Sequence, residues 1–283
     1  MNKFTVAVLQ LDSQDDVQKN LDTVTAFVEE AAGRGAKLIT MPESMNYVGL
    51  DNAGHAEEIP GGKTFELMAG LAKKYNVWLH CGSIYEKNPD DARPYNATMV
   101  IRPDGTLEPV HRKLRPTGSE RVIWGDADRG FFPTAGTPWG TMASLICWES
   151  YMPLARAALY EKGVTLYLSP NTNDNPEWQD AVRHIAREGR CFFINADLFF
   201  TRDMYPAHLR ETAEVQRLPQ IVCRGGSCIV DPFGHYVTQP VWDREEIIFA
   251  ELDMTQAAAA KMELDVCGHY ARPDVLRLTV NDR

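Results

Sequence analysis

The apolar residues of this chain fall into two kinds of run that follow one another. Residues 3–10 form a nearly unbroken apolar run, which is typical of a strand buried on both faces. Residues 17–31 instead repeat apolar positions at the helical period, with Asp15 or Asp16 placed to cap the helix. Residues 36–41 are apolar again. The pattern predicts a strand–helix–strand unit whose two strands are parallel, by the right-handed crossover rule.

The same alternation continues along the rest of the chain. The further strands expected from apolar runs are residues 77–85, 95–102, 106–114, 141–146, 164–168, 191–198, 225–231, 235–239 and 247–252. The further helices expected from helical spacing are residues 64–75, 154–160, 177–188 and 257–264. A Pro-Asp-Gly turn between 95–102 and 106–114 favours an antiparallel hairpin. Segments 115–138 and 201–220 show no period, and no repeat or linker interrupts the chain, so residues 1–283 are predicted to form a single α/β domain.

Composition and charge narrow the class of protein. The chain has 283 residues, of which 44% are hydrophobic, enough for a large core. Its formal net charge of −10 disfavours nucleic acid as a partner, because such a partner requires clustered Lys and Arg. No apolar run is long enough to cross a membrane, and the first residues lead straight into a strand without a signal-peptide core, so we expect a cytoplasmic protein with no membrane partner. The spacing of the six cysteines is typical of neither a disulfide framework nor a zinc site.

One cysteine stands where a strand ends and a helix is about to begin. Cys147 follows the apolar run 141–146 and precedes a Tyr-Met-Pro segment with helical spacing after it. In α/β proteins such a turn lifts a side chain out of the sheet and directs backbone N–H groups towards it, which favours a nucleophile. The alternative is a buried structural cysteine. Glu149 is predicted to be structural, bonding nearby backbone rather than taking part in the chemistry.

Two further candidates also stand at strand ends. Glu43 follows the second predicted strand and a proline, at the edge where active sites of α/β folds collect. Lys113 lies in the run His-Arg-Lys-Leu-Arg, residues 111–115, which ends the predicted hairpin. A solvated loop carboxylate and a solvated basic patch are the ordinary alternatives for these two features.

Together these three segments resemble the nitrilase superfamily of carbon–nitrogen hydrolases. The matching motifs are Met-Pro-Glu-Ser at 41–44, His-Arg-Lys-Leu at 111–114 and Ile-Cys-Trp-Glu at 146–149, in the family's order of Glu, Lys and Cys. The second half is most similar to the true nitrilases, through residues 112–117, 120–125, 147–154, 183–191, 226–227 and 268–275. The first hundred residues are more similar to ω-amidase-type members, and residues 169–174 differ from the usual nitrilase sequence. The long C-terminal extension of many nitrilases is missing.

The resemblance implies a fold, a reaction and a set of catalytic residues. The fold is a four-layer αββα sandwich, in which two mainly mixed sheets lie between helices. Cys147 would be the nucleophile, Glu43 the general base and Lys113 the cation that stabilises anionic intermediates. Glu120 would be a second carboxylate that orients Lys113 or the hydrolytic water. The reaction converts a nitrile to a carboxylic acid and ammonia through a thioimidate and a thioester, and it needs no metal or cofactor.

The sequence also offers candidate residues for the substrate pocket and a class of substrate. Trp124, Trp148 and Tyr47 are candidate pocket walls, with plain core packing as the alternative, and the loop at Asn171 is expected to contact the substrate. The substrate is predicted to be a small nitrile. A small amide hydrolysed by the same Cys-Glu-Lys set is the first alternative. A catalytically silent binding protein of the fold is the second.

The C-terminal tail, residues 268–283, carries too much apolar surface for a frayed end. Its apolar and aromatic residues include His269, Tyr270, Val275, Leu278 and Val280. Burial would stabilise them, either against their own domain or across a two-fold axis. By the resemblance, the tail is expected to lie at an oligomer interface, so the protein is predicted to be a homodimer or a higher homo-oligomer.

Overall fold

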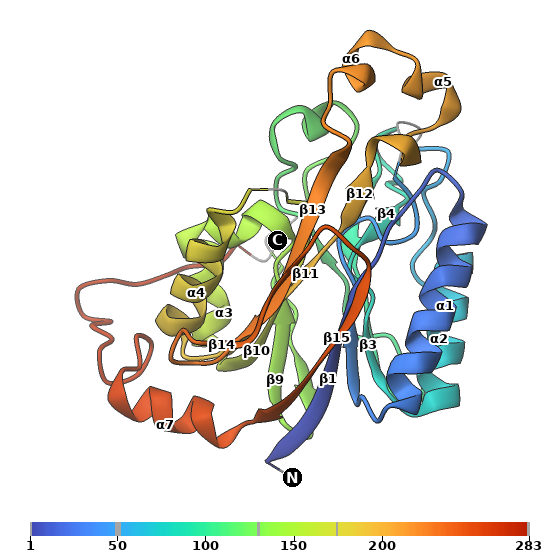
Figure 1. Cartoon of the computed structure of the whole chain (residues 1–283). Coiled ribbons are helices and arrows are strands. Elements are labelled where there is room, and N and C mark those ends of the chain that lie inside the picture. The colour runs from blue at the N-terminus through green and yellow to red at the C-terminus, as the bar shows by residue number, and fades with distance from the viewer. Residues whose placement is uncertain (1, 49–51, 129–130, 174, 282–283) are drawn as a thin grey trace.

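The computed structural model of the protein describes residues 2–48, 52–128, 131–173 and 175–281, and two large sheets pack face to face in it (Figure 1). The first sheet has the strand order β15-β1-β2-β3-β6. Its strands are β1 (Lys3–Gln10), β2 (Leu38–Thr40), β3 (Trp78–His80), β6 (Val100–Ile101) and β15 (Glu246–Asp253). β1, β2 and β3 are parallel, whereas β15 and β6 run antiparallel at the edges. The predicted parallel strand–helix–strand opening is therefore confirmed.

The second sheet has the order β12-β13-β11-β10-β9-β8, with β14 paired to β13. Its strands are β8 (Ala135–Thr137), β9 (Gly140–Ser144), β10 (Val164–Asn171), β11 (Phe192–Asp197), β12 (Phe199–Thr201), β13 (Ile221–Val230) and β14 (Tyr236–Trp242). β9, β10 and β11 are parallel, and antiparallel β8 and β13 flank them. The parallel strands of the two sheets end on the same side of the molecule, because Thr172 after β10 contacts Glu43 after β2.

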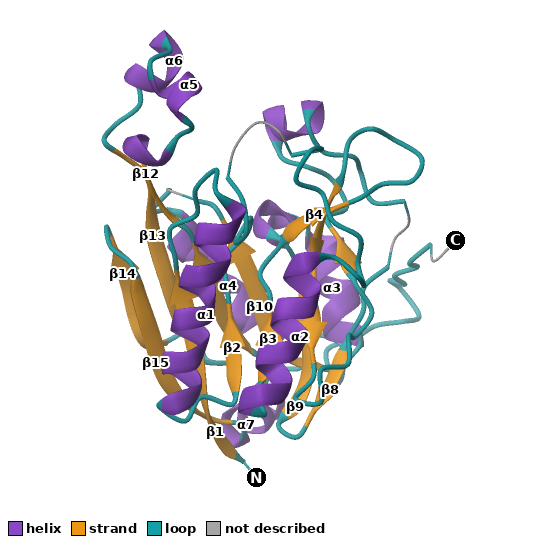
Figure 2. Ribbon diagram, turned by 90° about the vertical axis from the view of Figure 1, so that its right-hand side faces the viewer, coloured by secondary structure: helices purple, strands orange, loops and turns teal. Residues whose placement is uncertain are grey.

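Helices cover the outer face of each sheet and complete four layers, which lie side by side in Figure 1. Figure 2 looks onto the outer layer formed by α1 and α2. α1 (Val17–Gly33) and α2 (Lys63–Tyr75) pack on the first sheet, and α3 (Pro153–Glu161) and α4 (Trp178–Gly189) pack on the second. In β1, Val6 and Val8 belong to the core between the sheets, whereas Ala7 and Leu9 belong to the core under α1 and α2. Successive side chains of a strand point to opposite faces, so burial on both faces explains the unbroken apolar run. The predicted αββα sandwich is confirmed.

Two predicted strands are each divided between sheets, which corrects the sequence-based assignment. Residues 77–85 form β3 and, in a third small sheet, β4 (Ile84–Glu86); residues 95–102 form β5 (Tyr95–Thr98) and β6. The first break falls at Gly82, whose φ is +52°. A Cβ there would lie 1.9 Å from the carbonyl oxygen of Pro42. Only glycine lets the chain turn this close to the segment that carries Glu43.

The third sheet has the order β4-β5-β7 and leads directly to Lys113. β7 (His111–Arg112) pairs with β5 in antiparallel orientation. The predicted hairpin therefore forms, but in two parts. One part is this pairing, and the other is a single bridge between Ile101 and Leu107.

The two segments without a sequence period contain short structured turns. Segment 115–138 contains the 3₁₀ helix η1 (Gly118–Val122) as well as β8. Segment 201–220 contains η3 (Arg202–Met204), α5 (Ala207–Arg210) and α6 (Ala213–Gln216). These last elements project as an arm above β12 and β13 (Figure 1). Residues 129–130, 174 and 282–283, which belong to the predicted segments 115–138, 169–174 and 268–283, lie outside the described residues.

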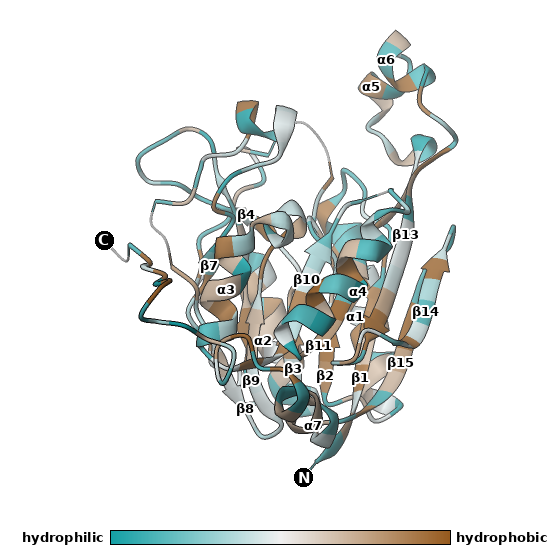
Figure 3. Ribbon diagram, turned by 90° about the vertical axis from the view of Figure 1, so that its left-hand side faces the viewer, coloured by the Kyte–Doolittle hydropathy of each residue, from teal (hydrophilic) through white to brown (hydrophobic). Residues whose placement is uncertain are grey.

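After α7 (Thr255–Glu263) the C-terminal tail runs past the side of the molecule that carries α3 (Figure 3). Leu278 and Val280 pack against the core under α3 and α4. Tyr270, Val275 and Leu276 are exposed instead. The tail thus buries part of its apolar surface on its own domain and leaves part in solvent. In the described part of the chain, no helix is both long and apolar enough to cross a bilayer.

Candidate active site

Three segments meet at the ends of strands and bring acid, cation and thiol together. The chain leaves β2 through Met41 and Pro42 to Glu43, it passes directly from β7 to Lys113, and it leaves β9 for Cys147. All three functional side chains are buried. In α/β folds the carboxyl ends of parallel strands collect polar side chains in this way, since the strands deliver neighbouring loops to one edge.

Cys147 begins the short 3₁₀ helix η2 (Cys147–Tyr151) with a left-handed backbone, at φ +55°. Residues other than glycine rarely adopt this conformation, and strain of this kind clusters at functional sites. Burial raises the pKa of the Cys147 thiol well above its usual range, the charge of Glu43 raises it further, and Lys113 opposes them. The resting thiol is therefore protonated at neutral pH, and it needs a base to become a nucleophile.

Lys113 is a fully buried cation held between two carboxylates. Its Nζ lies 2.8 Å from Oε1 of Glu43 and 2.9 Å from Oε2 of Glu120. Burial by itself would lower the pKa of Lys113, but the neighbouring acidic groups, Glu43 first among them, outweigh burial and raise it. The ammonium group therefore stays charged, and it provides a fixed positive charge inside the site.

Glu43 has one engaged and one unengaged carboxylate oxygen. Oε1 accepts hydrogen bonds from Nζ of Lys113 and, at 2.8 Å, from Nδ2 of Asn96. Oε2 is buried and has no hydrogen-bond partner among the described residues. The turn behind it is held by Ser44, which has a φ of +57° and donates its backbone N–H to Oγ of Ser83 at 3.0 Å. The unengaged oxygen is the group in the site best placed to accept a proton.

Glu120 both caps its own short helix and contacts Lys113. Its Oε2 accepts the backbone N–H of Thr117 at 2.7 Å, as in a capping box at the start of η1, and also accepts from Lys113. Burial raises the pKa of Glu120, and the charge of Glu43 adds to this effect while Lys113 opposes it. The surroundings of Glu120 therefore favour a protonated carboxyl group.

Glu149 joins the segment that carries Lys113 to the segment that carries Cys147. Its Oε1 accepts the backbone N–H of Leu114 at 2.6 Å. Its Oε2 accepts the backbone N–H of Ile146 at 2.7 Å and lies 2.9 Å from Nε2 of His111. Both oxygens are used and the carboxylate is buried, so Glu149 is a structural clamp that bonds nearby backbone, as predicted.

Comparison with known proteins identifies the family. A family model described as carbon-nitrogen hydrolase matches residues 5–262. The chain belongs to the carbon–nitrogen hydrolase family. The aliphatic nitrilase of Sinorhizobium fredii (strain HH103) is 37% identical to this hydrolase, over 100% of this chain and 97% of the relative. Nitrilase 2 of Arabidopsis thaliana is 38% identical, over 95% of this chain and 85% of the relative. The predicted superfamily is confirmed, and the chain is a hydrolytic enzyme.

Solved structures agree on the fold of this hydrolase. The NitFhit protein of C. elegans matches with a TM-score of 0.81 at 24% identity, covering 100% of this chain and 68% of that one. Nit3 of Saccharomyces cerevisiae matches with a TM-score of 0.80 at 22% identity, covering 96% of this chain and 97% of that one. At these identities the likeness establishes the architecture alone.

Two of the predicted pocket walls of the hydrolase are buried near the candidate catalytic cluster of Glu43, Lys113, Glu120 and Cys147. The ring of Trp124 lies 5.3 Å from Nζ of Lys113, and its Nε1 is buried with no hydrogen-bond partner among the described residues. Tyr47 is buried in the same aromatic cluster, in edge contact with Tyr85 at a ring separation of 6.2 Å. Trp124 thus reaches the site directly, whereas Tyr47 packs one layer behind it.

The other two predicted substrate contacts lie differently. The Trp148 side chain is 45% exposed and packs edge-on against Tyr151, so it lies at the surface next to Cys147. Asn171 is fully buried, and its Nδ2 donates to the carbonyl oxygen of Ser169 and to Oδ1 of Asn195, both at 2.8 Å. The amide nitrogen of Asn171 is therefore committed to the interior of the sheet, and its contact with a substrate stays a prediction.

Two residues of the site were not predicted from the sequence. Asn96 holds Glu43, as described above, and Thr172 donates a backbone hydrogen bond to the Cys147 sulfur. The side chain of Thr172 also lies 3.5 Å from the carbonyl oxygen of Glu43. A sequence signal existed for Asn96, since it is a polar residue within the buried strand β5. No pattern pointed to Thr172, because its contribution is a backbone N–H.

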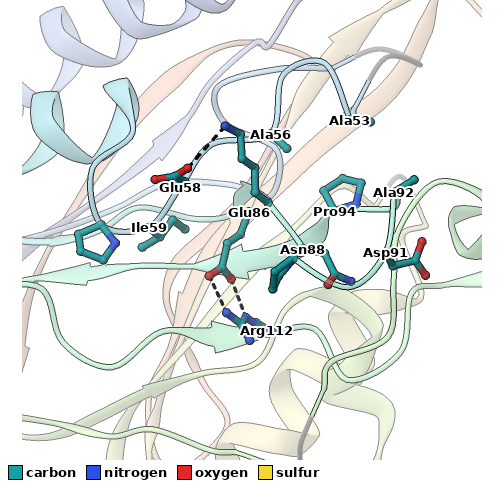
Figure 4. Close-up of a pocket in the computed structure, with 13 residues that line it drawn as sticks. Ala53, Ala56, Glu58, Ile59, Glu86, Asn88, Asp91, Ala92, Pro94 and Arg112 are labelled. Atoms are coloured by element: carbon teal, nitrogen blue, oxygen red, sulfur yellow. Dashed lines mark hydrogen bonds and ion pairs between the residues drawn. The ribbon is translucent and has the colours of Figure 1, made fainter.

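A wide groove of about 690 Å³ lies on the other side of the third sheet (Figure 4). Arg112 faces it and holds Glu86 through two hydrogen bonds of 2.6 and 2.7 Å. Neighbouring residues on a strand point to opposite faces, so Arg112 turns outwards while Lys113 turns into the catalytic cluster. None of Glu43, Lys113, Glu120 or Cys147 lines this groove. Within the described residues, no three His, Cys, Asp or Glu side chains are arranged as a metal site.

Proposed function

We propose that this carbon–nitrogen hydrolase is a nitrilase, which converts a nitrile and two waters to a carboxylic acid and ammonia with Cys147 as the nucleophile. The names of the relatives with 37% and 38% identity support the nitrile as substrate. The observation that carries the mechanism is the unengaged Oε2 of Glu43, buried in the same cluster as a protonated thiol. A carboxylate oxygen with no other partner can take the thiol proton as the sulfur attacks.

In the first step, Glu43 accepts the proton of Cys147 and the sulfur attacks the carbon of the cyano group. One π bond of the C≡N triple bond opens, and its electron pair becomes a negative charge on nitrogen. The ammonium of Lys113, together with the backbone N–H of Trp148, stabilises this charge. Glu43 then returns the proton to nitrogen, which leaves a neutral thioimidate.

In the second step, water adds to the thioimidate carbon and Glu43 accepts one of its protons. Glu43 passes this proton to the nitrogen, then takes the hydroxyl proton of the tetrahedral intermediate and passes it to the nitrogen as well, so that the C–N bond breaks and ammonia leaves. A thioester remains on Cys147. A second water attacks the thioester, the C–S bond breaks, and the acid leaves while the thiol is restored. Throughout, Lys113 remains charged, and Glu120 orients it together with Glu43.

An amide is the alternative substrate, since the same cluster would attack its carbonyl carbon and expel ammonia in one step fewer. The test is a panel of nitriles, each paired with the amide of the same carbon skeleton. The measurement is the initial rate of ammonia release and the yield of acid. A nitrilase releases ammonia from the nitrile faster than from the matched amide. Ammonia from the amides alone would instead identify an amidase.

We further propose that the enzyme works as a homodimer or higher homo-oligomer in the cytoplasm. Apolar surface is exposed around η2 and α3, at Trp148, Tyr151, Met152 and Leu154. The exposed tail residues Tyr270, Val275 and Leu276 add to this surface. Patches of this kind favour an interface, and a two-fold contact would use each patch twice. All six cysteines are free thiols, which is typical of proteins of the reducing cytoplasm.

A further inference from the structure

An apolar cavity of about 250 Å³ lies at the base of the arm formed by residues 202–220. Its apolar lining comes from the loop after β2, from the residues that directly follow β11 and η3, and from β12 and β13, through Val48, Leu198, Tyr205, Phe200, Val222 and Cys223. Leu198, Phe200 and Cys223 are buried and form its floor, and Phe200 meets the Tyr205 ring edge-on at 4.9 Å. An apolar cavity of about 150 Å³ is large enough for benzene, so this one can hold a phenyl ring or an alkyl chain of similar size.

The cavity shares a wall with the catalytic cluster. Thr172 lines the cavity, its backbone N–H donates to the Cys147 sulfur, and its hydroxyl lies 3.5 Å from the carbonyl oxygen of Glu43. Among the described residues that line the cavity, Thr172 is the one that contacts the cluster of Glu43, Lys113, Glu120 and Cys147. A molecule bonded to Cys147 therefore needs to pass Thr172 to reach the cavity.

The strand order sets the distance between the nucleophile and the cavity floor. Cys147 follows β9, Thr172 follows β10 and Leu198 follows β11, and these three strands are neighbours in the second sheet. Neighbouring strands are roughly 4.8 Å apart, so the floor lies on the order of 10 Å from the sulfur. At about 1.2 Å per bond, an extended chain reaches the level of Thr172 about four bonds from the sulfur and the floor about eight bonds from it.

We propose that this cavity binds the far end of the substrate, so that the preferred substrate carries an apolar alkyl or aryl group several bonds from its reacting carbon. This inference rests on the proposed function and names the substrate class of the same site. None of the described residues that line the cavity carries a charge. A substrate that ends in a second carboxylate is therefore disfavoured, because burying an unpaired charge is costly.

The test is a series of straight-chain nitriles from propionitrile to decanenitrile, with the matched amides and with ω-carboxy nitriles of equal length. We expect kcat/KM to rise about fourfold for each methylene that enters the cavity and then to level off. The ω-carboxy compounds should not show this rise. The length dependence is read on whichever of the two classes, nitrile or amide, the enzyme hydrolyses.

A variant that fills the cavity isolates its contribution. Val222→Phe places a ring in the space between β13 and Tyr205, so it should abolish the gain in kcat/KM with chain length. Val237→Phe is the matched control, since Val237 is exposed on β14 and lies outside the cavity lining. Circular dichroism and a melting curve check that both variants fold.

The outcomes separate the two proposals. Wild-type turnover without any length dependence, or a Val222→Phe variant that keeps the dependence, would overturn the cavity assignment and leave the nitrilase assignment standing. Length-dependent turnover of amides alone would overturn the nitrilase assignment and support the cavity. A change in particle mass in Val222→Phe with unaltered length dependence would instead assign the cavity to contact with a second copy of the chain.

Discussion

At the scale of single residues, the site combines a protonated thiol with a carboxylate oxygen that has no partner. Burial and the charge of Glu43 keep the proton on Cys147, and Oε2 of Glu43 has no hydrogen-bond partner among the described residues. By the proposed mechanism, the thiol gives its proton to this oxygen as the sulfur attacks the substrate carbon.

Replacing Cys147 with Ala should abolish turnover while the protein stays folded. Loss of a covalent nucleophile costs about three orders of magnitude or more in kcat, because no other group in the site can form the thioimidate. Ammonia release measures the loss, and circular dichroism measures the fold. A variant that keeps a tenth of the wild-type rate would exclude Cys147 as the nucleophile.

Mass spectrometry of a slowed enzyme locates the covalent intermediate directly. Glu43→Gln should slow hydrolysis of the adduct, so that substrate mass accumulates on the peptide that contains Cys147. Cys81 and Cys191 are the internal controls, since burial raises the pKa of both thiols and keeps them inert, that of Cys191 to about 12. An adduct on either of these two cysteines would contradict the mechanism.

Glu149→Gln should lower both stability and kcat. The carboxylate accepts two backbone N–H groups and contacts His111, whereas an amide has a single acceptor oxygen and turns its NH₂ group towards a donor. Loss of one such bond to a charged group costs about 1.5–3 kcal/mol. Urea unfolding measures the loss, and Glu161→Gln, at an exposed position on α3, is the control. Equal unfolding midpoints for the two variants would show that the hydrogen bonds of Glu149 do not stabilise the fold.

At the scale of elements, a single histidine joins the three sheets. His80 on β3 contacts Thr40 on β2 at 2.7 Å, Ser144 on β9 at 3.0 Å and Thr98 on β5 at 3.1 Å. Burial lowers the pKa of His80 to about 3, so the imidazole is neutral in the folded protein. Three hydroxyl partners satisfy a neutral ring but cannot balance a positive charge.

This histidine predicts a loss of stability in acid. The folded pKa lies below the usual value of 6.5, so the contribution is fully present above pH 6.5 and is lost as pH falls from 6.5 towards 3. The unfolding free energy should fall by up to about 1.4 kcal/mol per pH unit from this group. His80→Gln should remove that component of the slope, as measured by urea unfolding at pH 7, 6, 5 and 4. His208→Gln, at an exposed position, is the control. If His80→Gln and wild type have the same slope, His80 is not the acid-sensitive group.

At the scale of the whole molecule, the C-terminal tail packs on its own domain with some residues and exposes other apolar residues to solvent. Leu278 and Val280 pack on the core of their own domain, and Tyr270, Val275 and Leu276 face solvent. Own-domain packing explains part of the apolar content of the segment. The exposed part is available to a second copy of the chain, which is the proposed assembly.

Truncation after Cys267 should lower both the mass of the assembly and the activity. Light scattering measures the mass, and ammonia release measures the activity. Because truncation also removes Leu278 and Val280, a second variant isolates the interface. Leu276→Asp, at a residue that is 78% exposed, should lower the mass and leave the melting temperature unchanged. Met262→Asp on α7, 85% exposed, is the matched control. If the Leu276→Asp variant keeps the assembly mass of the wild type, the tail packs only on its own domain and does not form the interface.

The sequence pattern predicted an α/β fold, and the family resemblance added the four layers and the order of the candidate catalytic residues. Periodicity depends on which side chains are buried along one element, so β1, α1, β10 and α4 were readable from local pattern. Asp16 caps α1 through the backbone N–H of Lys19 at 3.0 Å, a contact only three residues long. Glu43, Lys113, Glu120 and Cys147 were found because each stands in a short motif near the end of an element.

Only the tertiary structure decided how distant segments share one edge. The apolar runs 77–85 and 95–102 read as single strands, but strand pairing with residues far away in the chain divides each between two sheets. Local pattern cannot carry this information, because sheet membership depends on the partner strand. The same holds for Asn96 on Glu43, for the backbone of Thr172 beside Cys147, and for the cavity whose lining spans residues 48–223. These features exist only where segments remote in sequence come into contact, so packing, and not composition or period, creates them.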